Sequence, residues 1–314
     1  MLYDNDDESL DIAKIQEQKL RKKAIICGSI VGICIIVMFV TIIFSIKQKN
    51  NQNIASSNEI KSETQVSPKK DNIYQGNHIQ IQQHNLDEIK MKFMPKANPN
   101  AQEEIRNIYY SDEKVAYLTF DDGPSKNITP QILDILKQEN VPATFFVLGS
   151  RVELNPDLVK REFEEGHYIA NHGYTHEYSL IYRSKDTVFE EYIKCENAVR
   201  NALGNQQYQM FLFRFPGGSS GGRYASIKSE AKEMLNSYGI AHTNWNCLTG
   251  DAEGKTNPEE LFAYFQATMA GDGSIIVLMH DASDKSYTVE TLPMVISYLR
   301  EQGYTFKNFY EIFR

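Results

Sequence analysis

The chain has 314 residues, a formal net charge of −8 at pH 7 and 41% hydrophobic residues. A length near 300 is enough for one large domain or two small ones. Because the balance is acidic and no basic stripe carries interleaved aromatic residues, we expect no nucleic acid as a partner. We also expect no nucleotide cofactor.

The first feature along the chain is an uncharged apolar run from residue 24 to residue 46. At about 1.5 Å per residue it is long enough to cross the roughly 30 Å apolar core of a bilayer. It lacks the small-x-small cleavage site of a secretory signal peptide, so we predict a retained transmembrane signal anchor. The flank before the run is richer in Lys and Arg than the flank after it. This bias predicts a single-pass cell-membrane protein, with a cytoplasmic tail over residues 1–23 and the rest of the chain outside the cell.

Residues 47–105 are rich in Asn, Gln, Ser and Lys and poor in aromatic residues. Such a segment cannot bury enough apolar surface to offset its ordering entropy, and we predict a flexible extracellular stalk. From residue 106 to residue 314 the pattern changes, and we predict one folded domain. Its two cysteines, Cys195 and Cys247, either form a disulfide or stay as free buried thiols.

Strand and helix patterns alternate through this domain. Strands are predicted over residues 115–120, 143–148, 167–171, 209–213, 240–244 and 274–279, and helices over 129–139, 156–165, 185–203, 226–237, 258–270 and 288–302. The alternation predicts parallel strands with crossover helices. Polar candidates follow the strands at Asp121, Asp122, His172, Arg214, Asp251 and His280. An open doubly wound sheet and a closed barrel both collect such residues at strand ends, but scatter over so many strands favours the barrel.

Two adjacent carboxylates, Asp121 and Asp122, end the first strand, and two histidines, His172 and His176, follow the third. Two imidazoles and one carboxylate make three ligands, and a catalytic metal keeps its remaining position open. The second carboxylate is then free for proton transfer, and buried Arg214 is its expected counter-charge. Taken alone, each pattern has an ordinary alternative, because histidines occur on surfaces and Asp-Asp-Gly-Pro is a good turn sequence.

Further candidates lie near the end of the domain. His280 ends the last apolar strand, where a histidine suits proton donation to a leaving amine near neutral pH. Asp251 is placed to orient and charge that imidazole. The alternatives are a satisfied strand-end histidine and an ordinary turn residue. The glycine-rich run 217–222 lets backbone N–H groups approach a substrate oxygen, unless it is a plain flexible loop.

Over residues 110–314 the chain resembles the polysaccharide deacetylases of carbohydrate esterase family four, the NodB-homology group. Thr119–Pro124 reads as the motif TFDDGP without departure. His172–His176 resembles H[ST]xxH, but Gly173 replaces the hydroxyl residue, which predicts a looser loop. Arg214–Gly217 resembles an RxPY-like motif, with glycine in place of the aromatic residue, which predicts a more open groove wall.

The remaining motifs diverge more. Leu278–His280 resembles the motif LxH. The motif DxxDW is the least similar: Trp245 and Asp251 fall in its region, and Ala252 stands where the aromatic residue would be. Trp245 is therefore only a candidate for the acetyl pocket, while Asp251 remains the candidate to tune His280.

The resemblance implies a distorted (β/α)₇-type barrel, the NodB-like deacetylase fold, after the N-terminal transmembrane helix. It implies a divalent metal, most often Zn²⁺, with Co²⁺ or a similar ion as the alternative. The roles it carries to this chain are general base for Asp121, metal ligands for Asp122, His172 and His176, positioning of the base for Arg214, oxyanion donor for the Gly217 N–H, acetyl-pocket lining for Leu278 and general acid for His280.

The resemblance and the outward topology imply a hydrolase that removes N-acetyl groups from N-acetylglucosamine residues of a cell-wall polysaccharide, with peptidoglycan first. Chitin, poly-N-acetylglucosamine and acetylxylan are the other family substrates. Two different classes stay open: an inert glycan-binding module on the same fold, and a metal-dependent amidohydrolase acting on a small molecule.

Overall fold

The computed structural model describes residues 92–269 and 273–314. The predicted cytoplasmic tail, the predicted anchor and the predicted stalk up to residue 91 lie outside these residues. Within the described ranges, no helix combines the length and the apolar character needed to cross a bilayer.

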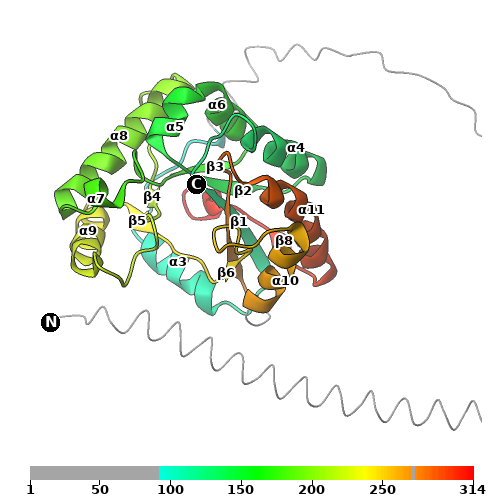
Figure 1. Ribbon diagram of the computed structural model, residues 1–314. Helices are drawn as coiled ribbons and strands as arrows, with labels where there is room; N and C mark the ends of the chain where they lie inside the picture. Colours follow the sequence, from blue (N-terminus) through cyan, green and yellow to red (C-terminus); the bar gives the residue numbers. More distant parts are fainter. Residues whose placement is uncertain (1–91, 270–272) are drawn as a thin grey trace, which may run out of the picture.

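The domain is built on one curved sheet of parallel strands (Figure 1). The strands are β1 (Val115–Asp121), β2 (Ala143–Val147), β3 (Tyr168–Asn171), β4 (Leu212–Phe213), β5 (Ala241–His242), β6 (Cys247–Leu248), β7 (Ile275–His280) and β8 (Thr305–Phe306). Their order is β5-β4-β3-β2-β1-β7-β6, and β8 pairs with the start of β1. The parallel crossover architecture agrees with the sequence prediction.

Helices cover this sheet, most of them on its outer face, whereas the first and the last described helix contribute side chains to the layer inside its curve (Figure 1). They are α3 (Ala101–Tyr110), α4 (Thr129–Glu139), α5 (Gly149–Leu154), α6 (Pro156–Glu164), α7 (Tyr178–Ile181), α8 (Lys185–Leu203), α9 (Ala225–Ser237), α10 (Pro258–Thr268), α11 (Ser286–Glu301) and the 3₁₀ helix η1 (Phe309–Glu311). Helix α8 has its predicted ends because Ser184 forms a capping box at its start and Gly204, at φ 61°, ends it.

The expected closed barrel is not formed, because β5 and β6, the two ends of the strand path, are not paired in the described sheet. Only residues 243–246 connect these two strands. A connection between neighbouring parallel strands needs about a dozen residues or more. The short segment therefore crosses the gap without forming a ladder, and the sheet is an open, half-barrel arrangement.

Helix α3 covers the edge of β5 beside this gap. The side chain of Gln102 accepts a hydrogen bond from the His242 N–H at 2.9 Å and donates to the His242 carbonyl at 3.2 Å. Tyr109 Oη lies 3.0 Å from Thr243 Oγ1. Side chains thus satisfy backbone groups that an edge strand would otherwise expose.

The folded domain therefore begins earlier than the predicted boundary at residue 106. Ile105 of α3 is 1% exposed, and Phe93 and Met94 pack against the buried core. The Lys96 N–H also donates to the Phe313 carbonyl at 2.6 Å, which ties the segment to the C-terminus. Composition suggested a stalk here because the apolar residues of this segment are few, but tertiary packing buries them.

Two apolar layers determine which side chains at the strand ends face the inside of the sheet. Along β1, Leu118 and Phe120 pack in the layer between the sheet and the helices, whereas Tyr117 packs inside the curved sheet. Side chains alternate along a strand, so Asp121 has the parity of the inner face. The same alternation on β7 places His280 on that face.

The two cysteines of the domain are buried as thiols. Cys195 and Cys247 are both fully buried, and neither forms a disulfide. The Cys195 thiol donates to the Val147 carbonyl at 3.3 Å, and burial raises the pKa of this thiol well above its ordinary value. They behave as small core residues.

Candidate active site

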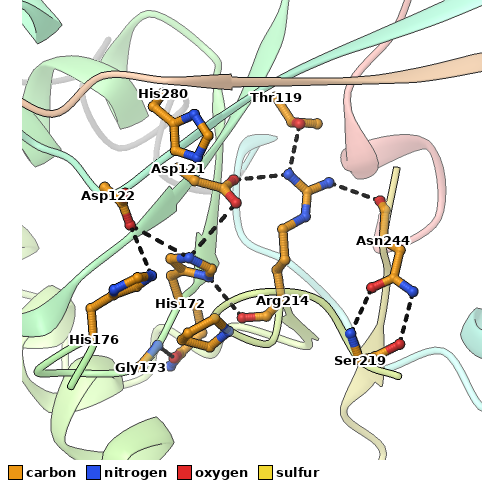
Figure 2. A network of polar contacts seen from close by, with 12 residues as sticks. Thr119, Asp121, Asp122, His172, Gly173, His176, Arg214, Ser219, Asn244 and His280 are labelled. Carbon is orange, nitrogen blue, oxygen red and sulfur yellow. Dashed lines mark hydrogen bonds and ion pairs between the residues drawn. The ribbon is translucent and has the colours of Figure 1, made fainter. Parts of the chain in front are cut away.

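Side chains from several strand ends meet at one end of the sheet (Figure 2). Parallel strands bring their carboxyl ends to the same edge. The chemistry-bearing residues gathered there are Asp121 and Asp122 from β1, His172 and His176 after β3, Arg214 after β4, Asp251 after β6 and His280 at the end of β7. The structure thus groups the residues on which the sequence prediction depended.

Asp122, His172 and His176 each place one ligand atom within 4.8 Å of the others. Asp122 Oδ1 lies 3.5 Å from His172 Nε2 and 3.4 Å from His176 Nε2. Figure 2 shows both rings facing this carboxylate. Among the described residues, the buried Asp122 Oδ1 has no hydrogen-bond partner. Because an unpaired buried oxygen is costly, this donor set fits a divalent cation such as zinc.

His172 is held in the tautomer that a metal ligand requires. Its Nδ1 lies 2.8 Å from the Arg214 carbonyl oxygen. Since a carbonyl only accepts, Nδ1 carries the proton and the lone pair is on Nε2, the atom that faces Asp122. Burial lowers the pKa of His172 to about 3, so the imidazole is neutral at physiological pH.

The backbone is strained at two of the three candidate ligands. Asp122 has φ 75° and His176 has φ 60°, a region that residues other than glycine rarely adopt. Strain of this kind persists where surrounding contacts impose it. Next to Asp122, a Cβ on Gly123 would lie 1.9 Å from Asp281 Oδ2, and Thr129 Oγ1 donates to that oxygen at 2.5 Å. The loop is fixed from behind by this packing.

Asp121 is oriented by a buried arginine. Asp121 is 2% exposed, and its Oδ1 accepts a hydrogen bond from Arg214 Nη1 at 2.8 Å. Arg214 Nη1 also donates to Thr119 Oγ1 at 2.7 Å, and the guanidinium lies 3.9 Å from the ring centre of Phe146. Burial raises the pKa of Asp121, and the Arg214 charge opposes that rise. Asp121 Oδ2 is left facing His172 Nε2, 3.7 Å away.

His280 lies beside Asp121 because β1 and β7 are in register at these two residues. His280 Nδ1 lies 2.8 Å from Asp251 Oδ1, and the His280 backbone N–H donates to Asp251 Oδ2 at 2.7 Å. Burial alone would lower the pKa of His280, but the hydrogen bond and charge of Asp251 raise it to about 9. The imidazole is therefore protonated near neutral pH. Asp251 binds Nδ1 only, so the Nε2–H group makes no hydrogen bond to Asp251.

Comparisons with known proteins agree with this arrangement. A family model described as Polysaccharide deacetylase matches residues 109–241. The solved structure of a Streptococcus mutans CE4 esterase is similar with a TM-score of 0.61 and 32% identity, and the match covers 71% of this chain and 94% of that chain. The chain belongs to the polysaccharide deacetylase family.

Relatives within this polysaccharide deacetylase family differ in length and in activity. Peptidoglycan-N-acetylglucosamine deacetylase PgdA of Listeria monocytogenes is 35% identical over 225 residues, covering 72% of this chain and 41% of the relative. This chain therefore spans less than half the length of that relative. A Bacillus anthracis protein described as a CE4 family pseudoenzyme is 27% identical, with a TM-score of 0.52, over 64% of this chain and 65% of that one.

The family motif has a hydroxyl residue where this chain has Gly173, and we expected the exchange to loosen the loop. The loop is instead held by hydrogen bonds. The Gly173 N–H donates to Asn171 Oδ1 at 2.8 Å, and the next two backbone N–H groups donate to Glu191 Oε2 at 2.8 and 2.7 Å. Neither acceptor was among the residues predicted from the sequence. Asn171 was recognisable as the polar end of β3, whereas Glu191 lies in α8 and carries no local signal.

Another residue that was not among the sequence-based candidates, Asn244, holds the glycine-rich loop of the domain. Its Oδ1 accepts from the Ser219 N–H at 2.9 Å, and its Nδ2 donates to Ser219 Oγ at 2.8 Å. Its carbonyl accepts from Arg214 Nη2 at 3.0 Å, as Figure 2 shows. Asn244, which lies shortly after the end of β5, therefore links this loop to Arg214, the arginine that orients the candidate base.

Two further residues, Leu278 and Trp245, are candidates for the acetyl pocket. Leu278 is 7% exposed and has the same inward parity on β7 as His280. Trp245 is partly buried, with the Arg214 guanidinium 5.8 Å from its ring centre. The wall at Gly217 is not open as predicted, because the Tyr178 side chain lies against it.

Proposed function

We propose that this polysaccharide deacetylase hydrolyses N-acetyl groups of N-acetylglucosamine residues in peptidoglycan and releases acetate. The single observation that carries the proposal is the juxtaposition of the three candidate ligands with a separate, arginine-bound carboxylate, Asp121. An inert scaffold has no need of both. The description of the Listeria relative supports the substrate.

Asp122, His172 and His176 would hold the metal, with Zn²⁺ as the first candidate and Co²⁺ or a similar ion as the alternative. When bound, the metal would supply a Lewis acid for the acetyl carbonyl and for the attacking water. The unpartnered Asp122 Oδ1 and the neutral His172 support this assignment.

Asp121 is the proposed general base. Because Arg214 Nη1 holds Oδ1, Oδ2 is the atom that takes the proton from the attacking water. A base positioned in this way contributes about 10²–10⁴-fold to the rate. Arg214 is a positioning residue, since it acts on the reaction through Asp121.

His280 is the proposed general acid. With Nδ1 bound to Asp251, Nε2–H is the donor for the leaving amine, and Asp251 keeps the ring charged and oriented. The Gly217 N–H has no backbone partner among the described residues, and we assign it to the oxyanion. Loss of one such donor costs about 10²–10³ in kcat. Leu278 and Trp245 are assigned to the acetyl pocket.

The location of the enzyme follows from the proposed substrate. Anchoring by residues 24–46, with the domain outside the cell, would allow a stalk of several tens of residues to reach the wall polymer. Deacetylation there would create free amines and so add positive charge to the wall.

The proposed function is tested by metal content and acetate release from purified peptidoglycan. Asp121→Asn should retain the bound metal and lose about 10²–10⁴-fold in kcat, because only the proton acceptor is removed. His176→Ala should lose both metal and activity, because a ligand is removed. Asp112→Asn, an exposed carboxylate just before β1, is the control and should match the wild type. Full turnover by Asp121→Asn would reject its role as base.

The inert glycan-binding module remains the second candidate, because a family relative is described as a pseudoenzyme. It predicts glycan binding with no acetate release by the metal-loaded wild type. The presence here of the three ligands, Asp121, Arg214 and His280 together favours the enzyme.

A further inference from the structure

The wall beside Gly217 is filled by a side chain from another element. A Cβ on Gly217 would lie 2.5 Å from Tyr178 Oη and 3.1 Å from Tyr178 Cζ. The phenol thus occupies the volume that a side chain at position 217 would need. Gly217 also has φ 71°, which favours glycine. The absence of a side chain at 217 and the presence of a tyrosine at 178 are therefore complementary.

Tyr178 is also next to the candidate metal centre. Its ring centre lies 5.5 Å from that of His176, with the planes tilted by 53°. The side chain is 40% exposed, so part of the ring is open to solvent. Few large apolar side chains are this exposed in the described part of the chain, and Tyr178 lies beside a ligand.

The ring is held from behind. The buried ring of Tyr182, one turn further along the chain, contacts Tyr178 edge-to-face with centres 5.8 Å apart. Tyr182 Oη donates to the Pro216 carbonyl at 2.7 Å. The loop that carries Gly217 therefore also holds Tyr182 in place. A ring that is fixed behind and open in front loses little conformational entropy when it binds a ligand.

We propose that Tyr178 is a substrate-positioning residue, whose ring packs on the sugar that carries the reacting acetamide. This inference rests on the proposed function for the identity of the ligand. A pyranose has apolar C–H faces that pack on an aromatic ring, and the phenol O–H can exchange hydrogen bonds with its hydroxyl groups. The position of the ring beside His176 places this contact at the sugar nearest the chemistry.

The contact predicts a particular kinetic change. The sugar ring does not change during amide hydrolysis, so Tyr178 binds the ground state and the transition state alike. Loss of such uniform binding raises KM and leaves kcat nearly unchanged. A merely structural role, acting through His176, would instead lower metal content and kcat together.

The test uses the metal-loaded enzyme and a tetramer of β-1,4-linked N-acetylglucosamine. Tyr178→Ala should raise KM about tenfold, with kcat and bound metal close to wild type. Tyr178→Phe should raise KM less, because the ring remains. Tyr238→Ala is the matched control, since Tyr238 is 62% exposed and precedes β5 at the opposite end of the strands. An unchanged KM in Tyr178→Ala, or a loss of metal with kcat, would overturn the proposal.

Binding of the same tetramer by calorimetry separates this inference from the proposed function. In the Asp121→Asn background, addition of Tyr178→Ala should weaken binding about tenfold. If the wild type releases no acetate from purified peptidoglycan but binding of the tetramer still depends on Tyr178, the proposed function fails and the role of Tyr178 stands. If the wild type is active and Tyr178→Ala does not change the affinity for the tetramer, the proposed role of Tyr178 is rejected and the proposed function stands.

The complementarity itself is tested by thermal unfolding. Gly217→Ala should lower Tm more in the wild type than in Tyr178→Ala, because only the wild type adds a clash with the phenol to the backbone strain at positive φ. Equal decreases in both backgrounds would contradict the packing on which the inference depends.

Discussion

Neighbouring residues in this site have opposite surroundings, and this division gives each a separate task. Asp121 is buried and bound to Arg214, whereas Asp122, at φ 75°, turns its Oδ1 toward the two histidines. His280 and Asp251 form a second charged pair beside them. The neighbouring carboxylates of this site therefore face different partners, which orient them for different tasks.

The His280–Asp251 pair gives a prediction at this scale. In metal-free protein, the pKa of His280 should be about 9 and should fall in Asp251→Asn, because the hydrogen bond and charge of Asp251 that oppose burial are removed while the smaller effects of the Asp121 and Asp122 charges remain. NMR titration of the histidine resonances measures this change. His242, whose pKa burial lowers to about 3, is the internal control and should stay neutral in both proteins. An unshifted His280 in the variant would show that Asp251 does not tune it.

The same shift has a consequence for stability. The pKa of folded His280 lies above the unfolded value of 6.5. Protonation of His280 therefore contributes stability that is fully present below pH 6.5 and is lost as the pH rises through about 9.

At the scale of elements, the site depends on strand register and on a helix that covers an open edge. Register between β1 and β7 sets Asp121 beside His280, and α3 satisfies the backbone of β5 next to the gap. Without α3, the short edge strand β5 would expose unpaired backbone groups next to the loop that Asn244 holds.

Helix α3 is accordingly expected to be part of the stable core. Ile105→Ala should lower the free energy of unfolding by about 2–5 kcal/mol, because it leaves a cavity in a fully packed layer. Asn107→Ala, on the exposed face of the same helix, is the control. Urea unfolding measures both. If both variants unfold alike, α3 contributes no packing and the domain begins where composition suggested.

At the scale of the whole molecule, the domain is one part of a longer predicted arrangement. The polysaccharide deacetylase domain occupies the described residues, and the predicted anchor at residues 24–46 lies before it. The proposed substrate, a wall polymer, cannot diffuse, so the predicted anchor would keep the site within reach of it.

The anchor is tested in cells. The full chain should fractionate with the membrane, and protease added to intact, wall-digested cells should cut the domain away. A chain lacking residues 1–46, directed outward by a cleavable signal peptide, should appear in the medium with kcat unchanged. Protection of the full-length domain from external protease would contradict the predicted topology.

Local sequence patterns alone specify the ends of α4 and α8 and the parallel crossover architecture, and they identify the polar residues that the structure gathers at the strand ends. These follow from local periodicity, capping and motif spacing, which act within a few residues. Tertiary packing is needed to explain why the strand path stays open, why Cys195 and Cys247 are apart, and why Glu191, Asn244 and Tyr178 lie at the loops of the site. Those outcomes depend on which distant segments pack together, and no local pattern encodes the partner of a buried side chain.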